Sequence, residues 1–173
     1  DLFNLFIDSE FLENVVRFTN EYSKDDQNWT DITVPELKVF IGIQILMGIK
    51  RLDEERDHWS DDQVLGTHVI RNAMKCKRYA QIKKYLHFCD ESEADKNDAL
   101  YKVRYLLEHT KTKSQALYEP TMWLAIDESL IGFKGRFKLL QYISSKSEKY
   151  GIKFFVCAES KTGYMIDWIC YTG

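Results

Sequence analysis

The sequence has 173 residues, the length of one ordinary domain or of a small domain with part of another. Its 45% of hydrophobic and 14% of aromatic residues are enough to form a core, which excludes an intrinsically disordered chain. The most apolar run, residues 39–49, is well short of the roughly 18 to 20 residues of a membrane-spanning helix, so no membrane partner is expected.

The formal net charge of −3 conceals an uneven distribution. Residues 1–70 contain 15 acidic and 6 basic residues, whereas residues 71–173 contain 12 acidic and 18 basic ones. Two segments are strongly basic: residues 71–84 contain no acid, and residues 134–153 contain only Glu148. Such local patches attract a phosphate backbone whatever the total charge, although a solvated surface has the same composition.

Helical periodicity dominates the first 118 residues. Apolar spacing predicts helices over 9–22, over 33–48, over a short segment ending near residue 74, over 77–88 and over 101–118. The second of these begins with a capping box, in which Thr33 precedes Glu36 by three residues and Pro35 lies in the first turn. Because this helix is apolar on nearly every side, we expect it to be buried within a bundle.

Strand patterns replace the helical ones after Pro120. Residues 122–130 predict a buried strand, residues 150–160 a second, and a turn at Ser160–Gly163 leads into a third over 164–173. Asp127 lies in the middle of the first strand. Three antiparallel strands with this acid resemble the start of an RNase H-like nuclease core, although many mixed folds have the same pattern.

A set of motifs in a fixed order covers nearly the whole chain. These are FTNEY (18–22), GIQILMGI (42–49), DHWS (57–60), KRYAQIKKYLHF (77–88), LYKVRYLL (100–107), AIDESLIGFKGR (125–136), QYI (141–143), KYGIK (149–153), ESKTGY (159–164) and YTG (171–173). In this order they closely resemble piggyBac-type transposases.

The resemblance implies an α+β fold. A helical DNA-binding and dimerisation module over residues 1–118 would precede the first three antiparallel strands of an RNase H-like catalytic core over residues 119–173, and this core is expected to be incomplete. The implied activity is excision and integration of DNA at TTAA sites. The implied partners are double-stranded DNA, namely the element ends and the TTAA target, and a second copy in a homodimer; the implied location is the nucleus.

Asp127 matches the first of the three catalytic aspartates of the family. Such carboxylates bind two Mg²⁺ or Mn²⁺ ions that activate the attacking oxygen and stabilise the leaving one. The alternative is a salt-bridged structural acid. Glu128 is expected on the opposite face of the strand, and Glu159 and Asp167 match neither of the other two aspartates, which are expected outside this chain.

Basic residues in two segments are candidates for contact with DNA phosphates, the alternative being exposed basic loops. Those that follow the catalytic strand are Lys134, Arg136, Lys138, Lys146 and Lys149. Those of the helical module are Lys75, Lys77, Arg78, Lys83 and Lys84.

Some positions depart from the family pattern. Ser144, Ser145 and Ser147 stand where prolines are common, and Glu159 stands where an aspartate is usual. The first alternative to an active transposase is therefore a domesticated, non-catalytic DNA-binding protein, and the second is a protein-interaction domain without DNA contact.

The four cysteines form no CxxC pair, and we expect free thiols.

Overall fold

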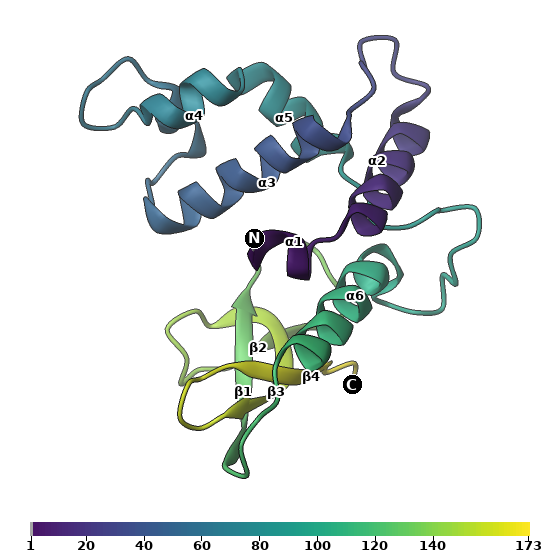
Figure 1. The fold of residues 1–173 in the computed structure, drawn as a ribbon, viewed down its shortest axis with the longest axis vertical. Coiled ribbons are helices and arrows are strands. Elements are labelled where there is room, and N and C mark those ends of the chain that lie inside the picture. The colour runs from purple at the N-terminus through teal and green to yellow at the C-terminus, as the bar shows by residue number, and fades with distance from the viewer. Residues whose placement is uncertain (1) are drawn as a thin grey trace. The chain divides into compact units, whose positions relative to one another are not determined.

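The computed structural model describes residues 2–173, which form two compact units (Figure 1). The helical unit, Ser9–Glu93, contains α2 (Ser9–Ser23), α3 (Val34–Ile49), the 3₁₀ helix η1 (Glu55–Trp59), α4 (His68–Ala73) and α5 (Cys76–Tyr85). The sheet unit, residues 2–8 and 94–173, contains α1 (Leu2–Phe6), α6 (Tyr101–Leu117), β1 (Leu124–Gly132), β2 (Leu140–Tyr142), β3 (Tyr150–Glu159) and β4 (Met165–Cys170). The chain thus combines helices with an antiparallel sheet.

The start of α3 has the capping geometry that its sequence predicts. The hydroxyl oxygen of Thr33 accepts a hydrogen bond from the backbone N–H of Glu36 at 3.4 Å, and Pro35 lies in the first turn. The carboxylate of Glu36 accepts two hydrogen bonds from Arg78 of α5, at 2.6 and 2.7 Å. The capping box therefore also ties α3 to α5.

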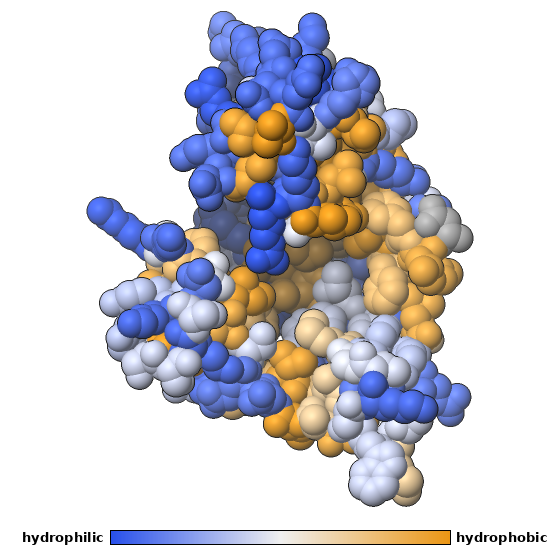
Figure 2. All heavy atoms as spheres, turned by 90° about the vertical axis from the view of Figure 1, so that its left-hand side faces the viewer, coloured by the Kyte–Doolittle hydropathy of each residue, from blue (hydrophilic) through white to orange (hydrophobic). Residues whose placement is uncertain are grey.

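The expectation that α3 is buried on all sides is wrong. Its buried residues Leu37, Phe40 and Ile43 lie on one face, whereas Ile45 and Ile49 are 52% and 78% exposed. Within the helical unit α3 is covered by α2, α4 and Tyr79 of α5, which occupy only part of its circumference. Hydrophobic side chains also reach the surface in Figure 2, where they are orange among blue polar ones.

β3 is the central strand of the sheet. β1 pairs with it antiparallel from Leu124 opposite Glu159 to Gly132 opposite Gly151. On its other edge β3 pairs with β2 near its start and with β4 near its end. The sheet thus has four strands instead of the three predicted. The prediction missed β2 because this strand has only three residues and shows no alternation that a sequence pattern could reveal.

α6 packs with the sheet in the same unit. The hydroxyl of Ser114 donates to the carbonyl oxygen of Met165, and Tyr164 Oη donates to the carbonyl oxygen of Ser114 at 3.0 Å. α1 lies against α6, where the ring of His109 bonds the carbonyl oxygen of Phe6 at 2.8 Å.

The domain boundary expected at residue 118 stays a prediction. No helix in residues 2–173 combines the length and apolar character needed to cross a membrane.

Glu159, at the end of β3, joins three segments of the sheet unit. Its side chain is buried and accepts hydrogen bonds from the hydroxyls of Tyr118 and Thr162 and from the backbone N–H of Thr121. These donors stabilise the charged form and lower the pKa of Glu159 to about 2. The network holds the connection between α6 and β1 against the β3–β4 turn.

Replacing Glu159 by glutamine should change how stability depends on pH. A carboxyl whose pKa is lowered on folding, here from 4.5 to about 2, stabilises the fold above pH 4.5 and loses that contribution as the pH falls towards 2. Glu159→Gln should therefore lower the melting temperature at pH 7 and flatten its dependence on pH below about 5. Thermal unfolding followed by circular dichroism tests this, with the exposed Glu148→Gln as control. Parallel pH profiles for Glu159→Gln and the unchanged protein would contradict it.

Candidate functional site

Asp127 lies in the middle of β1, opposite Val156 of β3. The expectation that this strand is buried is wrong: Asp127 is exposed, and Leu124 and Ile126 are 50% and 77% exposed. Among residues 2–173, β1 pairs with β3 alone, whereas α6 packs against β4. An apolar run of this length predicts burial only when other elements cover the strand.

Among residues 2–173, the carboxylate of Asp127 makes one hydrogen bond. Its Oδ1 atom accepts a hydrogen bond from the backbone N–H of Glu128 at 2.7 Å. No lysine or arginine among residues 2–173 forms an ion pair with it. An exposed carboxylate with unshared oxygen lone pairs is the type of ligand that a hard divalent cation prefers.

Two lysines hold the residue that follows Asp127. Lys153 Nζ lies 2.7 Å from Glu128 Oε1, and its ammonium group also lies 4.7 Å from the ring centre of Phe155. Lys146 Nζ donates to the backbone carbonyl oxygen of Glu128 at 3.0 Å. Glu128 thus points away from Asp127, as the alternation of a strand requires, and its fixed backbone also fixes that of Asp127.

The two other acids of the sheet unit considered as metal ligands, Glu159 and Asp167, have partners within the chain. Glu159 is buried in its hydrogen-bond network, and Asp167 forms an ion pair with Lys111 at 2.6 Å. Within residues 2–173, no group of three or more His, Cys, Asp or Glu side chains could hold a metal ion. None of the four cysteines forms a disulfide among residues 2–173. Asp127 would therefore be a single carboxylate ligand contributed by this part of the chain.

The basic residues after β1 divide into two kinds. Lys134, Arg136 and Lys138 are exposed on the β1–β2 loop, and Lys149 is exposed just before β3. Lys146 differs, because it is half-buried and its ammonium group bonds Glu128. Four of the five predicted phosphate contacts are thus accessible, whereas Lys146 has a structural partner.

The basic residues in and next to α5 divide in the same way. Lys75, Lys77, Lys83 and Lys84 are exposed, and Lys83 pairs with Glu55 at 2.5 Å. Arg78 is half-buried, and its bidentate contact with Glu36 occupies two of its nitrogens. Sequence reasoning placed Arg78 with the surface lysines because its partner lies 42 residues away.

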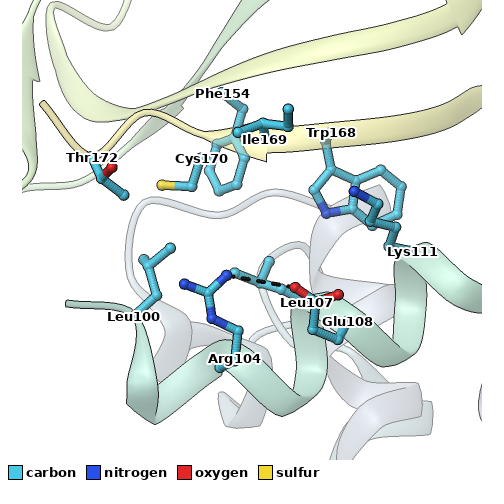
Figure 3. Close-up of a pocket in the computed structure, with 10 residues that line it drawn as sticks. All are labelled: Leu100, Arg104, Leu107, Glu108, Lys111, Phe154, Trp168, Ile169, Cys170 and Thr172. Atoms are coloured by element: carbon cyan, nitrogen blue, oxygen red, sulfur yellow. Dashed lines mark ion pairs between the residues drawn. The ribbon is translucent and has the colours of Figure 1, made fainter. Parts of the chain in front are cut away.

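A cleft of about 270 Å³ that no sequence pattern predicted lies between α6 and β4 (Figure 3). Arg104 lies on the α6 side, and Trp168 and Cys170 lie on the β4 side. Its charged groups are paired: Arg104 makes two hydrogen bonds to Asp98, at 2.8 and 2.9 Å, and an ion pair with Glu108. Burial raises the pKa of the Cys170 thiol. The charged side chains that line the cleft therefore have partners of opposite charge within the sheet unit.

The combination of helices with an antiparallel sheet is shared with proteins of the transposase class. A family model described as Transposase IS4 matches residues 1–173. One chain of a cryo-EM structure of the piggyBac transposase synaptic complex with hairpin DNA is similar to 99% of this chain, with a TM-score of 0.83 and 29% identity. The chain belongs to the Transposase IS4 family, and within it to the piggyBac-type transposases.

Two human proteins are also similar over most of the chain. PiggyBac transposable element-derived protein 3 of Homo sapiens is 26% identical over 173 residues, which is 100% of this chain and 29% of that protein. PiggyBac transposable element-derived protein 2 of Homo sapiens is 28% identical over 165 residues, 95% of this chain and 28% of that protein. The chain thus spans less than a third of these relatives and 38% of the matched chain in the cryo-EM structure.

The contact between Glu128 and Lys153 should show up as a measurable coupling energy. The lysine side chain is only 18% exposed, so water screens this pair less than a pair at the open surface. A double-mutant cycle with Glu128→Gln and Lys153→Met should give about 0.5–1 kcal/mol in the free energy of unfolding. Chemical denaturation provides the measurement.

The exposed pair of Glu21 and Lys24 in and after α2, whose side chains are 60% and 61% exposed, is the matched control. It should couple by no more than about 0.5 kcal/mol. Equal coupling in the two cycles would mean that Lys153 does not fix Glu128.

Proposed function

We propose that this chain is part of a DNA transposase in which Asp127 is one carboxylate ligand of two divalent metal ions. The observation that carries the proposal is the position of Asp127: an exposed acid on β1 without a cationic partner among residues 2–173, next to Glu128, which is held by two lysines. The similarity to the piggyBac transposase structure over 99% of the chain supports it.

The chemistry requires ligands that this chain supplies only in part. Cleavage of a phosphodiester by in-line displacement is favoured by two metal ions that stabilise the attacking and the leaving oxygen. Mg²⁺ and Mn²⁺ prefer carboxylate oxygens as ligands, and Asp127 would supply one of the carboxylates of such a site. Two further aspartates, expected outside residues 1–173 in an RNase H-like core, would complete it. Excision and integration at TTAA sites are the proposed reactions.

Double-stranded DNA is the proposed substrate, as element ends and as target. The matched cryo-EM chain belongs to a complex with hairpin DNA, which supports DNA binding by the present chain. The proposed phosphate contacts are exposed cations on the β1–β2 loop, just before β3, and in and next to α5: Lys134, Arg136, Lys138, Lys149, Lys75, Lys77, Lys83 and Lys84. Such contacts fix the position of the duplex without reading its sequence.

Association and location follow as further parts of the proposal. Val39, Ile45 and Ile49 of α3 are exposed apolar residues, which supports contact with a second copy in a homodimer. The nucleus is the proposed location, because the proposed target is chromosomal DNA.

A domesticated, non-catalytic DNA-binding protein is the second candidate. Its support is that two human relatives are named transposable element-derived proteins. Such a protein would keep the salt-dependent affinity for DNA and would lack strand cleavage.

Excision of a plasmid-borne element by the full-length protein, together with its affinity for duplex DNA at several salt concentrations, separates the candidates. An active transposase excises the element, and Asp127→Asn reduces excision to background because a metal ligand is lost while duplex affinity is kept. The exposed Glu148→Gln serves as the matched acid control and should excise normally.

Salt-dependent duplex binding without any excision would favour the domesticated protein, since phosphate contacts release counterions in both cases. Full excision by Asp127→Asn would contradict the catalytic proposal. Absence of salt-dependent binding would contradict both candidates.

A further inference from the structure

A pocket of about 740 Å³ lies beside η1 and α5 in the helical unit. Trp59 of η1 and Tyr79 of α5 provide its aromatic surface, and Ala80 of α5 also lines it. This volume is within the range of sites that bind small organic groups. The apolar periodicity of α5 does not predict this pocket, and contact with DNA phosphates does not require one.

The aromatic surface of the pocket is held rigidly. The indole N–H of Trp59 donates to the carbonyl oxygen of Met74 at 2.7 Å, and its ring lies 4.8 Å from that of Tyr79. Tyr79 is 3% exposed, and its hydroxyl accepts a hydrogen bond from Gln44 at 2.8 Å. Trp59 is half-buried and therefore presents part of a fixed ring to the pocket.

Cations surround this aromatic surface. Arg56, Lys77, Lys83 and Lys84 line the pocket together with a single acid, Glu55. Glu55 pairs with Lys83, and Lys84 lies 3.9 Å from the carboxylate of Asp26 outside the pocket, so among residues 2–173 Arg56 and Lys77 are the lining cations without an ion pair. The site therefore suits a ligand that is both flat and negatively charged.

We infer that this pocket binds an unstacked nucleobase of single-stranded DNA, with the neighbouring phosphates on its cations. The inference rests on the proposed DNA-binding function and adds a second mode of contact to it. Inside a duplex, both faces of a base are covered by its neighbours, so only a base from a single strand or an opened end can stack on Trp59. Every base has such a face, and the site would therefore have little sequence preference.

Ala80→Leu tests the inference by filling the pocket while leaving its ring and its cations in place. Ala80 is exposed on α5, and leucine is a good helix former, so the helix should persist. Ala116→Leu is the matched control, an exposed alanine of α6 in the sheet unit. The measurement is fluorescence anisotropy of the full-length protein with an oligothymidine and with a duplex of equal length.

The expected result is a loss of affinity for the oligothymidine of roughly 5- to 150-fold in Ala80→Leu, the range of one base–aromatic stack. Duplex affinity and its dependence on salt should stay unchanged, and Ala116→Leu should behave as the unchanged protein. An oligonucleotide of the same length made of abasic sugars provides a test without any variant: the unchanged protein should bind it as weakly as Ala80→Leu binds oligothymidine.

Each other outcome overturns the inference. Equal affinity for oligothymidine and the abasic strand, with duplex binding intact, would reject the base site and leave the proposed function standing. Loss of salt-dependent binding to every DNA would reject the proposed function together with the base site. Competition by an acidic peptide but not by oligothymidine would assign the pocket to a protein partner instead.

Discussion

The antiparallel pairing of β1 with β3 is the constraint on which the rest of the sheet unit depends. It runs the full length of β1, from Leu124 opposite Glu159 to Gly132 opposite Gly151. This register sets Asp127 on one face and Glu128 on the other, because neighbouring side chains of a strand alternate. A slip by one residue would exchange the two acids and remove Glu128 from Lys153. The position of the candidate metal ligand is therefore a property of the whole strand pair.

One end and the middle of this pairing are fixed by polar contacts. At one end, Glu159 collects donors from Tyr118, Thr121 and Thr162, and so fixes where the chain enters β1. In the middle, Lys146 and Lys153 hold Glu128. These contacts lie beside Asp127 and leave its carboxylate accessible. The rigidity of the site thus comes from neighbours that take no part in the proposed chemistry.

The sequence predicted those features that depend on residues close together in the chain. The cap of α3 needs only Thr33 and Glu36, and the limits of α6 follow from its own periodicity. Features that depend on distant partners were missed. The exposure of β1 and α3 depends on which elements cover them, and a pattern counts apolar residues without knowing their neighbours. The contacts of Lys146 and Arg78 join residues 18 and 42 positions apart, so a charge count placed both on the surface.

Binding of Mn²⁺ to the full-length protein, followed by electron paramagnetic resonance, tests the central claim most directly. If Asp127 is a metal ligand, Asp127→Asn should weaken Mn²⁺ binding by at least about tenfold, since even a residue that only supports a ligand contributes that much. The exposed Glu148→Gln should bind Mn²⁺ as the unchanged protein does. Equal affinity in Asp127→Asn and the unchanged protein would contradict the account.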